Sequence, residues 1–175
     1  MIRRNVLGLS VITALGLALL PGNASAEQKS LKDQLAGTWV MVSNTTTRSD
    51  GTKFETFGSN PKATAIYGTN GRFVSITIRS DLPKFASNNR TTGTADENKA
   101  VVQGSIAYFG TYSVDEADKS FTAQVEGATF PNWTGTAQKR TVVFSGNEMT
   151  QSLATGSAGG SVEIKWKRVP AVAIN

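Results

Sequence analysis

The chain has 175 residues, 39% of them hydrophobic, which is enough for one domain with a sizeable core. It has no cysteine, which excludes disulfides, thiol nucleophiles and a lipid-modified cysteine. It has no histidine either, which excludes Ser-His triads and the common zinc sites, so any catalysis must use carboxylate, Arg, Lys or Tyr.

Residues 1–26 are predicted to be a secretory signal peptide. Arg3 and Arg4 precede an apolar run over 6–20, and residues 24–26 match a cleavage site. An uncleaved anchor is the alternative, and the flanking residues favour general secretion over the twin-arginine route. Cleavage leaves 16 basic against 13 acidic residues, a net charge of +3. We expect a periplasmic or secreted monomer with no membrane insertion after cleavage, and scattered basic residues argue against nucleic acid as a partner.

The mature domain, residues 27–175, is expected to begin with one or two helical turns over 30–35. A first strand follows from Gly37. Its alternation places Trp39, Met41 and Ser43 on one face.

The clearest hairpin joins residues 64–67 to residues 73–78, since Asn70-Gly71 supplies the backbone angles of a tight turn. In its second arm, aliphatic residues from Val74 onward alternate with polar residues from Ser75 onward. This alternation predicts a strand with one dry and one wet side.

Residues 80–94 are too polar for a buried element and are interpreted as a mobile flap. A capping box over 94–97 then predicts a short helix that ends at Gly104. The loop and helix either cover one end of the domain or form a surface excursion, and the sequence does not decide between them.

Three central strands are predicted over 106–114, 121–128 and 136–144, and two more precede the C-terminus. The total is eight to nine short strands with hairpin connections. Only closure leaves no exposed edge strand, so we predict an all-β fold, an antiparallel up-and-down barrel with one inserted helix.

The register of the central hairpins decides which side chains meet. If the loop after the second central strand is symmetric about Trp133, Glu126 lies opposite Arg140 and Gln138 lies opposite Ala128. An odd-numbered loop around Ala117 would also set Tyr108 against Glu126, whereas a two-residue turn would set Ala107 there. We favour the odd-numbered loop.

Two ends of the domain resemble the ends of lipocalin-type barrels, where a tryptophan on the first strand packs near a basic residue from the last. These ends are Gly37-Thr38-Trp39 and Trp166-Lys167-Arg168. Further segments occur in the order found in the bacterial and fungal lipocalin-like domain family, which the mature chain resembles over nearly its whole length: residues 67–72, 107–112, 125–127 and 131–136, with Gln138 and Arg140. Barrels of this type include carriers, inhibitors and some isomerases or cyclases. The resemblance places a histidine where Gln124 stands, which counts against catalysis here.

The resemblance and the strand pattern together predict a cavity for one small apolar or amphipathic molecule, with no cofactor and no metal. The candidate interior residues are Trp39, Met41, Tyr108, Tyr112, Gln124, Glu126, Gln138, Arg140 and Trp166.

Three interpretations of Glu126 and Arg140 remain open. They form a structural ion pair, or Arg140 also anchors a carboxylate or carbonyl of a ligand, or Glu126 is the general base of an isomerase or cyclase. A barrel without ligand, with a structural or protein-binding role, is a further alternative. The acidic residues over 115–118 suggest a solvated turn rather than a calcium loop.

Overall fold

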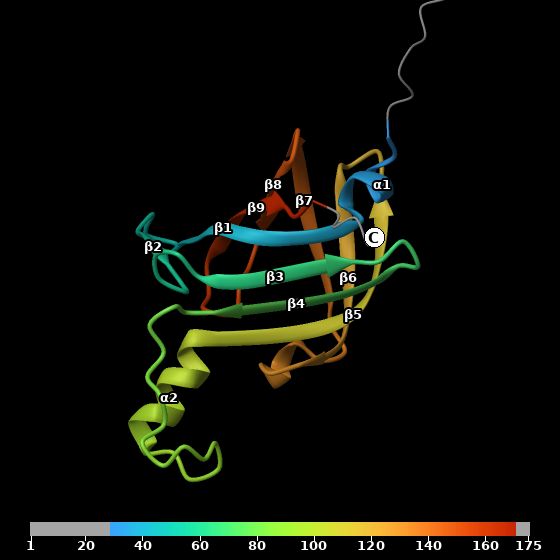
Figure 1. Cartoon of the computed structure of the whole chain (residues 1–175). Coiled ribbons are helices and arrows are strands. Elements are labelled where there is room, and N and C mark those ends of the chain that lie inside the picture. Colours follow the sequence, from blue (N-terminus) through green and yellow to red (C-terminus); the bar gives the residue numbers. More distant parts are fainter. Residues whose placement is uncertain (1–28, 171–175) are drawn as a thin grey trace, which may run out of the picture.

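Alternating strands and tight turns build a closed antiparallel barrel in the computed structural model, which describes residues 29–170 (Figure 1). Eight strands follow one another around the barrel, and the first pairs with the last to close it, while β2 adds a short ninth strand beside β1. The predicted all-β barrel with one inserted helix is therefore confirmed. The strands are β1 (Gly37–Thr47), β2 (Lys53–Glu55), β3 (Lys62–Tyr67), β4 (Arg72–Ile78), β5 (Ser105–Asp115), β6 (Ser120–Ala128), β7 (Ala137–Ser145), β8 (Glu148–Leu153) and β9 (Ser161–Arg168). The helices are α1 (Leu31–Leu35), α2 (Ala95–Gly104) and the 3-10 turn η1 (Pro131–Trp133).

Helix α1 packs against one end of the barrel through its buried Leu31 and Leu35. The Trp39 indole donates to the Leu35 carbonyl at 2.8 Å, and the central carbon of the Arg168 guanidinium lies 4.2 Å from the centre of the Trp39 ring. Arg168 also donates to the carbonyl of Ala36 at 2.6 Å and to that of Gln34. The expected contact between the first-strand tryptophan and a basic residue of the last strand is confirmed.

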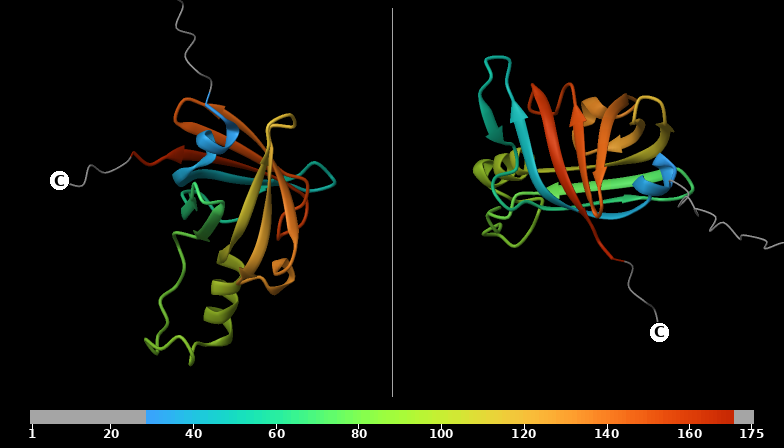
Figure 2. Two further views of the ribbon diagram at one scale, coloured as in Figure 1. Left: turned by 90° about the vertical axis from the view of Figure 1, so that its right-hand side faces the viewer. Right: turned by 90° about the horizontal axis from the view of Figure 1, so that it is seen from above.

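The other end, which we call the mouth, lies where β1, β6 and β8 finish and where β5 and β9 begin. Helix α2 and the loop before it project from the mouth (Figures 1 and 2). The predicted capping box is present: the Thr94 hydroxyl accepts from the Glu97 amide, and the Glu97 carboxylate accepts from the Thr94 amide. The same carboxylate accepts from the Ala86 amide at 2.8 Å, which ties the loop to the helix.

Two strands present different faces from those expected. A β-bulge between Met41 and Ser43 shifts the pairing of β1 with β9, so Asn44 replaces Ser43 in the inward series. In β4 the polar Ser75 is buried, while the aliphatic Val74 is half-exposed on the outer wall. The prediction of a dry aliphatic side in β4 is therefore wrong.

The predicted register of the central hairpins is also wrong. A four-residue turn joins β5 to β6 and sets Tyr108 opposite Ala128, not opposite Glu126. A bulge between Phe109 and Gly110 then leaves Glu126 without a cross-strand partner on β5. At this bulge a Cβ on Gly110 would lie 1.9 Å from the Gln124 carbonyl oxygen, so only glycine fits there.

The loop from β6 to β7 is not symmetric about Trp133. Turn η1 occupies its first half, and the chain then folds back so that the Gly135 amide donates to the Val125 carbonyl and the Val125 amide donates to the Thr136 carbonyl. Strand β7 therefore starts late, and Arg140 lies opposite Phe121 rather than Glu126.

Candidate functional site

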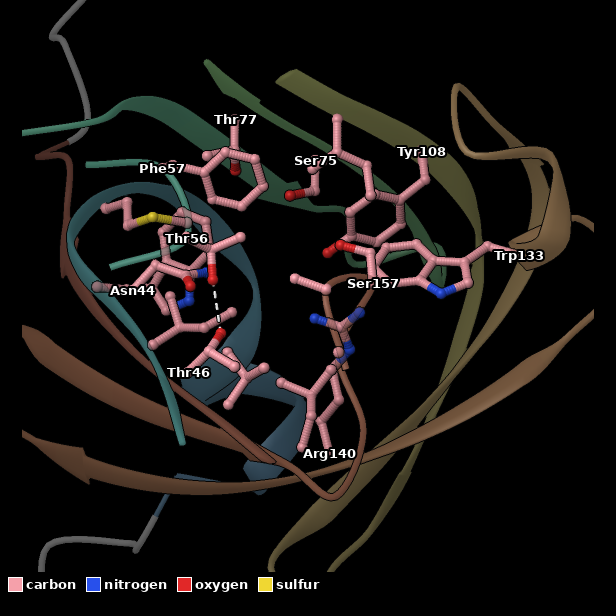
Figure 3. A pocket seen from close by; sticks show the side chains of 18 residues that line it. Asn44, Thr46, Thr56, Phe57, Ser75, Thr77, Tyr108, Trp133, Arg140 and Ser157 are labelled. Carbon is pink, nitrogen blue, oxygen red and sulfur yellow. Dashed lines mark hydrogen bonds between the residues drawn. The ribbon is translucent and has the colours of Figure 1, made fainter. Parts of the chain in front are cut away.

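A small cavity of about 40 Å³ lies inside the barrel near the mouth (Figure 3). Polar side chains from β1 and β4 line one side of it, and aromatic side chains and an arginine line the other. Its walls include Met41, Asn44, Thr46, Phe57, Ser75, Thr77, Ile106, Tyr108, Trp133, Arg140, Ile164 and Trp166.

Arg140 is the one charged residue among those that line this cavity, and it is only 2% exposed. Strand alternation places it inward together with Val142, while Lys139 and Thr141 face outward. Its guanidinium points into the cavity toward Tyr108, and its central carbon lies 5.3 Å from the centre of that ring (Figure 3).

The hydrogen-bonding capacity of Arg140 is only partly used. Its Nη2 donates to Oε1 of Gln138 at 2.8 Å, whereas its buried Nε has no hydrogen-bond partner among residues 29–170. In the same part of the chain no carboxylate lies within ion-pair distance of Arg140. The guanidinium is therefore a buried cation whose charge is not neutralised by the described part of the protein.

Other polar groups are buried in the barrel interior. The amide nitrogen of Gln151 donates to the Tyr67 hydroxyl at 3.0 Å, and burial raises the pKa of Tyr67 above its ordinary value. Besides Arg140 Nε, three atoms are buried without a partner in the described chain: Asn44 Oδ1 and Trp166 Nε1, whose residues line the cavity, and Gln151 Oε1, whose residue does not. Buried polar atoms are normally satisfied, so this degree of incompleteness points to a polar guest or water in the cavity.

A larger pocket of about 510 Å³ opens at the mouth and is predominantly apolar. It shares Thr56, Phe57, Ile106, Ser157 and Ala158 with the inner cavity, so the two spaces adjoin each other. Its outer wall includes Val101 and Val102 from α2. Helix α2 thus flanks the mouth and is not a mere surface excursion. Residues 80–94 do not line the mouth pocket. The mobility expected of that loop stays a prediction. The remaining wall comes from Phe54, Gln103, Ser105, Thr129 and Phe130.

The structure brings together only part of the predicted site. Met41, Tyr108, Arg140 and Trp166 line the inner cavity, and Gln138 orients Arg140.

Two further predicted residues are buried but lie outside the walls of the inner cavity. Trp39 packs toward α1, and Tyr112 donates its hydroxyl proton to the Gly68 carbonyl at 2.8 Å. They belong to the core that supports the barrel.

Gln124 and Glu126 face outward, so their assignment to the interior is wrong. Glu126 accepts two hydrogen bonds from Arg72, each 2.9 Å long, and both side chains of this pair are exposed. Phe121, Ala123 and Val125 take the inward positions of β6 because their side chains are apolar. The interpretation of Glu126 as a buried general base is contradicted by this placement, as is the ion pair with Arg140.

The sequence analysis missed the polar wall of the cavity. Ser75 and Thr77 are almost fully buried, and they share the inward face of β4 with Phe73. The signal was available in the hairpin itself: Tyr67 pairs with Phe73, and two large aromatic rings at one end of a hairpin favour the inside. The remaining inward positions of β4 follow from that choice by alternation.

Neither a metal-binding cluster nor a membrane-spanning helix is found among residues 29–170. Between residues 29 and 170, no cluster of three or more His, Cys, Asp or Glu side chains is arranged to hold a metal ion. Within the same range, none of the helices has both the length and the apolar character needed to cross a membrane. Two acidic side chains of the turn after β5 have partners on other elements: Glu116 accepts a hydrogen bond from the Leu31 amide of α1, and Asp118 forms an ion pair with Lys139 of β7.

Similar proteins include one domain family and one solved structure. A search of curated proteins finds no match. Among solved structures, a lipocalin-like protein from Bacteroides uniformis is similar, with 14% sequence identity, a TM-score of 0.42, and coverage of 77% of this chain and 98% of the other. The model of the lipocalin-like domain matches residues 36–169, which span the whole barrel from the end of α1 to the end of β9. The chain belongs to the lipocalin-like domain family.

Proposed function

We propose that this protein is an exported binding protein that holds a small, largely apolar molecule at the mouth of its barrel. The observation that carries the proposal is the apolar mouth pocket of about 510 Å³, which adjoins the inner cavity of the barrel. Its volume falls within the range of about 300–1,000 Å³ that is usual for small-molecule sites. The signal pattern at residues 1–26, which lies outside the described residues, supports export to the periplasm or medium as a soluble monomer.

Binding of Nile red, a neutral apolar dye, tests this proposal. The assay uses mature protein, whose N-terminus we expect to be Glu27 when exported material is sequenced. Wild type should bind the dye saturably, and Val102→Asp should weaken binding at least tenfold because it places a charge on the wall of the mouth pocket.

Val143→Asp is the matched control. Val143 is 69% exposed on the outer wall of β7, and Val102 is 78% exposed on α2, so the two substitutions are similar in chemistry and in exposure. Dye affinity should change less than twofold in the control. Absence of saturable binding to wild type, or equal losses in the two variants, would contradict the proposal.

A further inference from the structure

We propose that the ligand carries a carboxylate, and that it enters the barrel carboxylate first to bind Arg140 in the inner cavity. This inference rests on the proposed binding function and adds the chemical class of the ligand and its orientation: an apolar body with an anionic end.

The charge balance of the cavity is the first argument. Every ion pair among residues 29–170 involves exposed side chains, and none includes Arg140. A buried guanidinium is costly unless a counter-charge and hydrogen-bond acceptors surround it. Within the described chain, its partners are one amide oxygen of Gln138 and the face of Tyr108. The missing element is an anion.

The unused hydrogen bonds are the second argument. Arg140 Nε and Trp166 Nε1 are both donors, both are buried without an acceptor in residues 29–170, and both residues line the inner cavity. A carboxylate is an acceptor-only group with two oxygens, and a guanidinium binds it through charge-assisted hydrogen bonds. A neutral alcohol would supply one uncharged oxygen, so it would leave the charge of the guanidinium unbalanced.

The sizes of the two spaces are the third argument. A volume of about 40 Å³ holds roughly three water-sized groups, which suits a carboxylate and excludes the body of a ligand. The mouth pocket is more than ten times larger and is apolar. The two spaces share walls, among them Phe57 and Ile106, so a molecule that spans both places its charged end inside and its apolar body at the mouth.

Paired ligands that differ only at one end test the inference. Decanoate and 1-decanol are titrated into the mature protein by calorimetry at pH 7 and low ionic strength. Wild type should bind decanoate at least tenfold more tightly than decanol. In Arg140→Met this ratio should fall to about one or below, and in Arg140→Lys it should be intermediate, because an ammonium keeps the charge but loses the planar fork.

Arg72→Met is the matched control, because it removes an arginine whose carboxylate partner, Glu126, lies on the outer wall. The decanoate-to-decanol ratio should stay at the wild-type value there. A wild-type ratio near one, or a ratio that Arg140→Met leaves unchanged, would overturn the inference while Nile red binding still supports the mouth pocket. Failure of Nile red, decanoate and decanol alike would overturn the binding function and the inference with it.

A second measurement does not depend on the folding of any variant. With carboxyl-labelled decanoate bound to wild type, the ¹³C resonance of the carboxyl group is followed as a function of pH. The titratable residues near Arg140 in the described chain are Tyr67 and Tyr108, and neither is a carboxylate that would compete with the ligand. A guanidinium neighbour favours the ionised carboxyl, so the pKa of bound decanoate should lie below that of free decanoate. A bound pKa equal to or above the free value would refute contact with Arg140.

Discussion

The buried charge of Arg140 is expected to lower the stability of the ligand-free protein and to favour binding of an anionic ligand. Its guanidinium is buried beside Tyr108 and hydrogen-bonded to Gln138, yet no described carboxylate offsets its charge. Removing one member of a buried ion pair costs about 3–5 kcal/mol, because it leaves an uncompensated charge behind. In the ligand-free barrel the uncompensated charge is already present, so its removal should have the opposite sign.

The substitution Arg140→Met tests this at the residue scale. Met fills much of the same volume without a charge, so the free energy of unfolding of the ligand-free protein should stay level or rise by up to about 2 kcal/mol. Urea melts at pH 7 measure the difference. Arg72→Met, which breaks an exposed ion pair, should change stability by less than about 1 kcal/mol. A loss of more than about 1 kcal/mol in Arg140→Met would show that the guanidinium is needed for the fold.

At the scale of elements, strand positions were predictable and strand register was not. Alternation and turn residues define strands such as β7, and the observed β7 bounds differ from the predicted ones by one residue at each end. Register depends on loop geometry. The predicted register assumed symmetric loops and strands without bulges. The turn η1 makes the loop from β6 to β7 asymmetric, and the bulge at Gly110 adds an unpaired residue to the pairing of β5 with β6. A shift of one residue moves a side chain to the opposite face of the sheet.

In the candidate site, too, the inward or outward direction of a residue on its own strand was easier to predict than its partner on the neighbouring strand. Arg140 was predicted to be interior because its own strand alternates cleanly, and this is confirmed. The partner assigned to it, Glu126, depended on register across two loops and was wrong. Ser75 was missed because short polar residues were assumed to face solvent, whereas the aromatic pair of Tyr67 and Phe73 decides which face of that hairpin is buried.

Glu97 gives the loop before α2 a pH dependence. Hydrogen bonds from the backbone amides of Ala86 and Thr94 to the carboxylate lower the pKa of Glu97 below its ordinary 4.5. Since the folded pKa is depressed, the tether is fully formed above pH 4.5 and is lost as pH falls through the lower folded value. In a ¹⁵N NMR titration, the Ala86 amide should therefore shift with a midpoint below pH 4.5.

Two isosteric variants separate Glu97 from the general effect of acid. The acid transition of the Ala86 amide should disappear in Glu97→Gln. It should persist in Asp96→Asn, which changes the neighbouring carboxylate in the first turn of α2. A transition that survives Glu97→Gln, or one centred at or above pH 4.5 in wild type, would assign the titration to another group.

At the scale of the whole molecule, the two ends of the barrel have different roles. One end is sealed by α1, where Trp39 and Arg168 satisfy carbonyls at the end of the helix. The mouth holds the larger, predominantly apolar pocket. Burial at the sealed end lowers the pKa of Arg168 below its ordinary value. Substitutions at the sealed end should therefore act on stability and leave the mouth unchanged.

Arg168→Ala tests this separation. The variant leaves the carbonyls of Gln34 and Ala36 without their donor and removes the stacking on Trp39, so it should lower the free energy of unfolding by about 2–4 kcal/mol. Lys167→Ala, at an exposed neighbouring position on β9, should cost less than about 0.5 kcal/mol. Urea melts measure both losses.

Well below the melting range, the Nile red affinity of Arg168→Ala should stay within twofold of wild type, because the stacked guanidinium and the mouth pocket lie at opposite ends of the barrel. A tenfold loss of affinity in the fully folded variant would instead show that the two ends are coupled, and that α1 sets the shape of the mouth through the barrel wall.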